Sequence, residues 1–257
     1  MSPMTRVPTR THFFSSRLIR ILSDLAILEA VEPSAGFSEK LSLWVDYSDA
    51  IALSIALNAG NPSPLGTRAA AHSVAGDAAG AALARLRARL ENSITQVDFS
   101  TPGKSLLEWP SPDFELPLKV ATAYEPYRRY YAAYQRQMDA DIRPLRVGVR
   151  AALAKTSPSL SQLAALDAAL DKVLCERESQ LLSTVPLLLR KRFEHLLRAH
   201  QQTLLDTQQV DKPDHWMQQG GWLARFCNEL QTVLLAELDV RLQPTVGLIE
   251  ALQNEKK

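Results

Sequence analysis

The chain has 257 residues, of which 46% are hydrophobic and 22% are charged, and its formal net charge is +1. This composition excludes wholesale disorder, and the balanced charge argues against a protein that binds nucleic acid or membranes over its whole surface. Leu and Ala dominate the apolar residues and only 10 residues are Gly, which favours helices over strands. No apolar run of about 18 residues occurs, so no membrane-spanning helix is expected. We predict an all-α protein.

Two helices are predicted in the first sixty residues. Apolar residues recur at helical spacing over 15–30, and Ser15 or Ser16 can cap this first helix. A second helix begins near Ser38. Its segment 50–57 is apolar nearly all round, which is typical of a helix that is buried on most sides.

An Ala-rich stretch follows over 67–97. Its second half has leucines at heptad-like spacing and predicts a helix. Gly76 and Gly80 weaken the helical pattern of its first half, so the sequence leaves open whether 67–82 is ordered.

Four prolines within 98–118 prevent a continuous helix there. We interpret this segment as a proline-rich linker between an N-terminal helical region, 1–97, and a C-terminal helical region, 119–257. No internal repeat of solenoid type is found.

The C-terminal region is predicted to contain long helices with short breaks. Ser157 and Pro158 are a good start for one of them, and a leucine stripe runs over 160–197. A last helix is expected over 221–241. Prolines should modify these helices: Pro126 suits a first turn, Pro144 a kink or break, Pro186 a bend, Pro213 a break and Pro244 an interruption. The pattern predicts an elongated helical bundle with coiled-coil-like long helices.

The segment 124–150 is the most distinctive. Its heptad-like positions carry Tyr124, Tyr127, Tyr131, Tyr134 and Met138. This spacing is typical of a helix core or a protein interface, so these residues are a candidate interaction face.

Arginines interleave with the tyrosines in the same segment. Aromatic rings combined with guanidinium groups can hold single-stranded nucleic acid. The alternative hypothesis is therefore a nucleic-acid-binding helix, whose contacts would include Arg128, Arg129, Arg136 and Arg143.

Other chemical motifs are weak. The Gly103-Lys104-Ser105 run lacks the upstream Gly of a phosphate loop, where Asp98 stands instead. His195 and His200 are five residues apart, which suits neither a helical zinc pair nor a di-iron motif. No metal ligand set and no cofactor are predicted.

Two further groups could in principle do chemistry. Asp46 and Asp49 share a helix side and could act as an acid–base pair if desolvated, although a solvated polar side is the simpler interpretation. Cys175 and Cys227 lie in apolar helical patterns without an activating motif. Their low number also suits a reducing, cytoplasmic compartment. No catalytic residue is predicted, and the protein is expected not to be an enzyme.

Two stretches resemble an uncharacterised proteobacterial family, a domain of unknown function. One runs from Ser16 to Arg20 and continues in LWVDYSDAIAL at 43–53. The other is RLQPTVGLIEAL at 241–252. The resemblance covers nearly the whole chain and implies no activity, cofactor or catalytic residue. Genes of similar proteins lie near those of cell-envelope proteins, which implies an accessory role in an envelope complex.

The working hypothesis is thus a helical interaction or adaptor protein. It would bind a protein partner, or a second copy of itself, through the tyrosine face and the 160–197 leucine stripe. The identity of the partner and the oligomeric state are not determined by the sequence.

Overall fold

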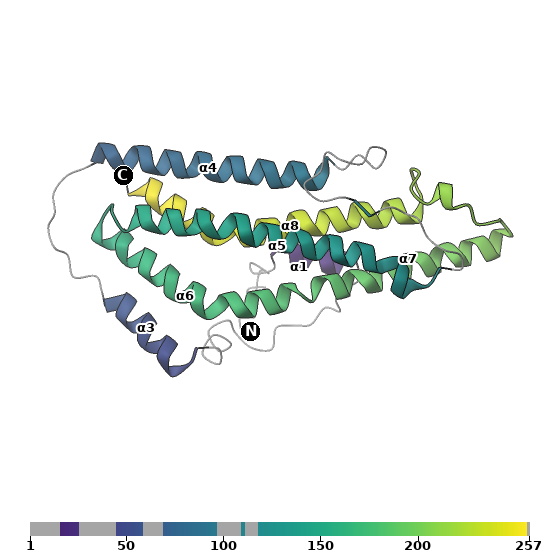
Figure 1. Cartoon of the computed structure of the whole chain (residues 1–257), viewed down its shortest axis with the longest axis horizontal. Coiled ribbons are helices and arrows are strands. Elements are labelled where there is room, and N and C mark those ends of the chain that lie inside the picture. Colours follow the sequence, from purple (N-terminus) through teal and green to yellow (C-terminus); the bar gives the residue numbers. More distant parts are fainter. Residues whose placement is uncertain (1–15, 26–44, 59–68, 97–108, 111–117, 256–257) are drawn as a thin grey trace, which may run out of the picture.

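The computed structural model describes residues 16–25, 45–58, 69–96, 109–110 and 118–255 (Figure 1). Every regular element among them is helical, which confirms the all-α prediction. In chain order these elements are α1 (Arg17–Asp24), α3 (Tyr47–Asn58), α4 (Ala69–Thr95), α5 (Val120–Leu153), α6 (Pro158–Leu182), α7 (Val185–Thr207), the 3-10 helix η1 (Pro213–His215) and α8 (Trp222–Asn254).

The helices form an elongated bundle around α8, as predicted (Figure 1). Helices α1, α4, α5 and α7 all pack against α8. Helix α6 returns along α5 after a short turn, and α3 packs on α6 at the edge of the bundle. Supercoiling of the long helices remains a prediction.

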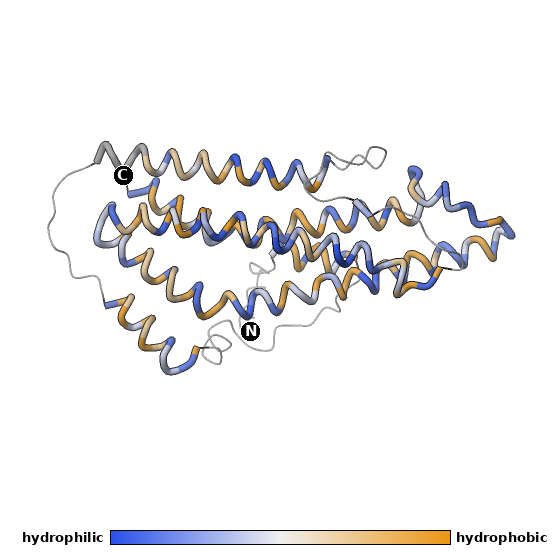
Figure 2. The backbone as a smooth tube through the Cα atoms, viewed as in Figure 1, coloured by the Kyte–Doolittle hydropathy of each residue, from blue (hydrophilic) through white to orange (hydrophobic). Residues whose placement is uncertain are grey.

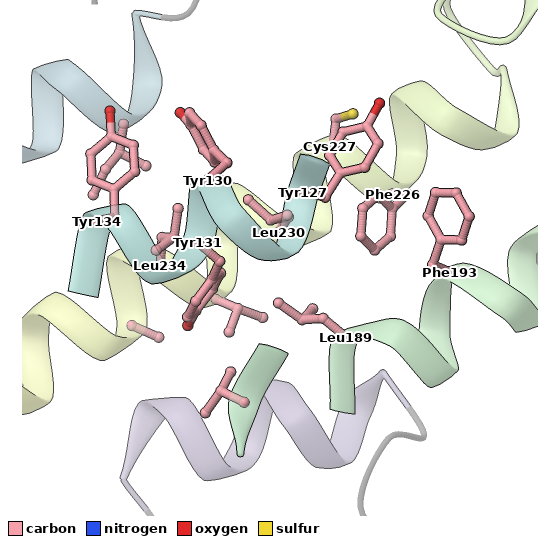
Figure 3. Packing of buried hydrophobic residues seen from close by; sticks show 14 of the residues in the cluster. Tyr127, Tyr130, Tyr131, Tyr134, Leu189, Phe193, Phe226, Cys227, Leu230 and Leu234 are labelled. Atoms are coloured by element: carbon pink, nitrogen blue, oxygen red, sulfur yellow. The ribbon is translucent and has the colours of Figure 1, made fainter. Parts of the chain in front are cut away.

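One hydrophobic core joins the two predicted helical regions. It contains Leu18 of α1 and Leu90 of α4. Residues of α5, α7 and α8 belong to the same core, among them Tyr127, Phe193 and Phe226 (Figure 3). The described helices on both sides of the predicted linker therefore share this core. The predicted linker 98–118 lies largely outside the described residues, apart from 109, 110 and 118.

Two predicted helix starts are confirmed. The Ser16 hydroxyl accepts a hydrogen bond from the Ile19 amide at 3.3 Å and caps α1. The Ser157 hydroxyl accepts one from the Leu160 amide at 3.3 Å and caps α6, whose first residue is Pro158. Each cap satisfies one of the amides that a helix start leaves without a partner.

The interruption predicted at Pro244 is absent, and of the kink or break predicted at Pro144 the break is absent. Pro126 and Pro144 both lie inside the continuous helix α5, and Pro244 lies inside α8, which runs on to Asn254. In each case buried residues on both sides of the proline hold the helix against the core, and this packing outweighs one lost backbone hydrogen bond. Pro186 instead occupies the first turn of α7, where its missing N–H costs nothing.

The Ala-rich stretch forms one helix, α4, through both of its glycines. At Gly80 a Cβ would lie 3.0 Å from Nε2 of Gln253, and at Gly76 it would lie 3.4 Å from the Gln253 side chain. Both glycines therefore face the Gln253 side chain in the last turn of α8, and only at Gly80 would a Cβ require that side chain to shift.

Candidate interaction surface

The five residues of the predicted interaction face lie inside the bundle. Their side chains are no more than 2% exposed, and the chain's own helices cover them (Figure 3). This corrects the prediction of an accessible face, while the core interpretation of the same spacing is confirmed. The five are Tyr124, Tyr127, Tyr131, Tyr134 and Met138.

The tyrosines join an aromatic cluster at the centre of the core. The Tyr127 ring meets the Phe226 ring edge to face at 5.4 Å, and Phe193 of α7 packs against both of these rings. Burial raises the pKa of Tyr127, which lies beside the Cys227 thiol. Burial also raises the pKa of that thiol to about 12, so Cys227 is an inert core residue.

A buried ion pair anchors the tyrosine row to α8. Glu237 is fully buried and accepts hydrogen bonds from the Tyr131 hydroxyl at 2.7 Å and from the Gln135 amide at 3.1 Å. Arg241 pairs with the same carboxylate at 2.8 Å and also contacts Asp139. Each member has partners, as a charge in a core requires.

The arginines of the alternative hypothesis lie on the outside of α5. Arg128, Arg129, Arg136 and Arg143 are all exposed. Hydrogen bonds from Arg128 and Arg129 lower the pKa of Glu125 to about 2, so these two cations already have an acidic partner. The tyrosine rings are buried and cannot stack on bases in this structure. The nucleic-acid hypothesis therefore loses the aromatic stacking that it required, and only the arginine contacts are left.

A small polar cleft lies between α5, α6 and α8. Its volume is about 60 Å³, room for roughly two water molecules. Arg143, Arg146, Asp171, Glu178 and Arg241 line it with other residues. Burial raises the pKa of Glu178 against the opposing influence of Arg241 and Arg146. The cleft balances cations and carboxylates, which is typical of an ion-pair network between packed helices.

The remaining predicted candidates are not brought together into one site. The Asp46 carboxylate accepts a hydrogen bond from the Asp49 amide at 2.7 Å, which caps the start of α3 and lowers the pKa of Asp46. His200 is 3.0 Å from Asp211. Among the described residues no group of His, Cys, Asp or Glu has the geometry of a metal site. Residues 103–105 lie outside the described residues.

The leucine stripe over 160–197 is also used mainly inside the bundle. Leu160, Leu189 and Leu197 are buried, whereas Leu181 and Leu187 are exposed at the junction of α6 and α7. Most of the stripe is therefore unavailable to a partner.

Helix α3 has the exposed apolar surface that the tyrosine row lacks. It packs on α6, and Ala52 and Leu53 are half-buried while Ala56 is buried. The Gln162 side chain of α6 donates a hydrogen bond to the Leu57 carbonyl. The exposed residues of α3 include the large apolar Tyr47, Ile51, Ile55 and Leu57. We call these four, together with the exposed Ser48, Ala50, Ser54 and Asn58, the outer face of α3. Tyr47 is 84% and Ile55 64% exposed.

The sequence indicated this apolar surface through the segment 50–57, but the segment was predicted to be buried rather than exposed. A helix that is apolar all round was expected to be buried on most sides. The structure corrects this expectation, because among the described helices α6 alone makes appreciable contacts with α3 (Figure 2). Ala56 is the one buried residue of α3. A helix that is apolar all round can also be one that its own chain covers on one side and a partner covers on the other.

The described helices include none with the length and apolarity needed to cross a membrane. No curated protein and no solved structure matches the chain. A family described as "Protein of unknown function (DUF3348)" matches residues 4–254. This match extends over α1, α3 and the whole bundle and contains both stretches on which the resemblance rested. The chain is therefore a member of this family of unknown function, DUF3348.

Proposed function

We propose that this protein is a non-enzymatic helical interaction protein that binds another protein through the outer face of α3. The observation that carries the proposal is the exposure of four large apolar side chains, Tyr47, Ile51, Ile55 and Leu57, on one short helix. Contiguous exposed apolar surface of this kind marks protein interaction sites in soluble proteins.

The remainder of the molecule supports the same proposal. The bundle core uses its aromatic and leucine residues internally, and its buried charges are paired. Helix α3 differs because its large apolar side chains lack such cover. Helix-in-groove recognition uses anchors at this spacing, in which Tyr47, Ile51 and Ile55 follow one another at intervals of four residues.

A photo-crosslinking amino acid at position 55 tests the proposal in cells that express the full chain. We expect a covalent adduct with a protein at position 55 and none at position 205, because Leu205 is similarly exposed, at 72%, but lies on α7 away from α3. An envelope protein in the adduct would support the accessory role that the family resemblance implies.

A double substitution makes the test specific to the apolar side chains. Ile51→Gln with Tyr47→Gln should abolish the adduct formed at position 55, since Gln preserves the helix but removes apolar area. Leu205→Gln with Val210→Gln is the matched control and should leave the adduct intact. Equal adducts at 55 and 205, or an adduct that survives the α3 substitutions, would refute the proposal.

A further inference from the structure

Two prolines lie at the same level of the bundle in neighbouring helices. Helices α5 and α8 pack side by side and run in the same direction (Figure 1). Asp139 of α5 pairs with Arg241 of α8, and the last turns of the two helices share one hydrophobic cluster. Contacts therefore advance along both helices together, and this register places Pro144 of α5 beside Pro244 of α8.

Each of these prolines is followed by a glycine about one turn later. Gly148 follows Pro144 in α5, and Gly247 follows Pro244 in α8. A proline inside a helix removes a backbone hydrogen bond, and a glycine gives the backbone extra freedom. A Cβ at either glycine would meet no other described atom within 4 Å, so packing does not require glycine there. Both helices are therefore locally weak at one level.

The hydrophobic core is divided at this same level. The buried residues of α5 up to Ile142 and of α8 up to Leu242 belong to the core around the aromatic cluster. Between the two clusters lies the fully buried Thr245, whose hydroxyl makes no hydrogen bond within the described part of the chain, which weakens the packing around it. Beyond the prolines, seven buried residues form a separate group, which we call the end cluster: Val149, Leu153, Leu160, Ala164, Leu248, Ile249 and Leu252.

The other two long helices cross this level without a buried side chain. In α6 the described stretch 165–181 contains only half-buried and exposed residues. The same holds for 77–89 of α4, where the half-buried Leu83 packs against both clusters. The polar cleft also lies here, since Arg143 and Arg241 line it. Apolar packing is therefore weaker at the level of the two prolines than on either side of it.

We propose that Pro144, Gly148, Pro244 and Gly247 form a double hinge, about which the end cluster moves relative to the central core. Proline and glycine are the residues at which helices bend most readily. A bend in one helix alone would pull it away from its neighbour. Weak points at the same level of two parallel helices let α5 and α8 bend together and keep their contacts on both sides of the hinge.

The elements beyond the hinge are tied to one another. Arg150 of α5 forms ion pairs with Asp167 at 2.6 Å and with Asp171 at 2.7 Å, both on α6. Helix α3 packs on α6, and the Gln162 side chain donates a hydrogen bond to the Leu57 carbonyl. The hinge therefore moves α3 together with the end cluster. The inference does not rest on the proposed function, because the hinge acts whether or not α3 binds a partner.

Pairs of spin labels on the full chain test the hinge through the width of the distance distribution between them. In a Cys175→Ser background, whose remaining cysteine is buried, labels at Ala165→Cys and Lys191→Cys lie on opposite sides of the hinge. Labels at Arg136→Cys and Arg198→Cys both lie on the central core and form the control pair. We expect the first distribution to be at least about twice as wide as the second. Equal widths would overturn the inference.

Alanine substitutions then locate the motion. Pro144→Ala and Gly148→Ala, combined with Pro244→Ala and Gly247→Ala, restore the amide donors and remove the extra backbone freedom. The distribution across the hinge should narrow to the width of the control pair. Pro126→Ala is the matched control, because it removes a proline inside the same helix α5 but far from the hinge, and should leave the width unchanged. A distribution that stays wide after all four substitutions would place the motion elsewhere and overturn the inference.

Discussion

The centre of the bundle and helix α3 are both built from apolar residues at helical spacing, but the large side chains are buried in the first and exposed in the second. Around Tyr127, Phe193 and Phe226, every large side chain is covered by another helix of the same chain. On α3, Tyr47 and Ile55 face outward although they are as apolar as many core residues. Apolar periodicity thus indicates that a surface needs cover but does not say which molecule supplies it.

Matched truncations in the two regions should differ most. Phe193→Ala removes a fully buried ring from the aromatic cluster and should lower the free energy of unfolding by about 3–5 kcal/mol. Ile55→Ala on α3 should change it by no more than about 0.5 kcal/mol in the monomer, because its side chain is already exposed.

Urea unfolding followed by circular dichroism measures both free energies at a protein concentration where the monomer dominates. A large loss of stability for Ile55→Ala under these conditions would mean that α3 is covered within the chain. The distinction between the two regions would then be wrong.

Removal of a buried and of an exposed arginine should give the next largest difference in unfolding free energy. The Arg241 side chain is 7% exposed and pairs with the fully buried Glu237, so Arg241→Met leaves a buried carboxylate without its cation. We expect a loss of about 3–5 kcal/mol in unfolding free energy. Arg198→Met removes a cation that is 78% exposed and 3.7 Å from Glu194, and should change stability by less than about 0.5 kcal/mol.

The two arginine variants are compared by the same urea titration. Restoration of stability in Arg241→Met by adding Glu237→Gln would confirm that the unpaired charge is the cause, since the second substitution removes the charge but keeps an oxygen that accepts from Tyr131. Similar values for the Arg241 and Arg198 variants would contradict the importance of the buried pair.

The smallest expected effect concerns Glu178 in the polar cleft. Burial raises the pKa of Glu178 above its ordinary 4.5 in the folded chain. A carboxyl group with a raised folded pKa favours the folded state when it is protonated, and this contribution is lost as the pH rises through that pKa. Glu178→Gln should therefore stabilise the fold at neutral pH, by at most about 0.5 kcal/mol because solvent screens a part-exposed carboxylate.

Thermal unfolding at neutral pH and at a pH well below 4.5 measures this dependence. The gain from Glu178→Gln should disappear at the lower pH, where the natural side chain is protonated as well. A gain of equal size at both pH values would show that the charge of Glu178 is not responsible.

Local features of the fold were predictable because they depend on neighbouring residues. The serine caps at Ser16 and Ser157 and the break near Pro213 follow from rules of helix ends, and the structure has them. The continuity of α5 through Pro144 was not predictable, because it depends on packing against helices that are distant in the sequence.

The candidate surface was less predictable than the fold. The heptad positions of Tyr124 to Met138 indicated a buried seam but could not distinguish the chain's own core from a partner. The segment 50–57 was identified as apolar, but its position at the edge of the bundle depends on how α6 is placed. Both errors concern which surfaces meet, and one sequence alone carries little information on that.

The central position of α8 has a consequence for how the protein is made. Helices α1, α4, α5 and α7 all pack on α8, which follows every one of them in the chain. Arg17 of α1, for example, pairs with Asp239, which is 222 positions later in the chain. The side of each earlier helix that contacts α8 therefore stays uncovered until α8 itself has been synthesised, and this exposed apolar surface makes the partly synthesised chain prone to aggregation.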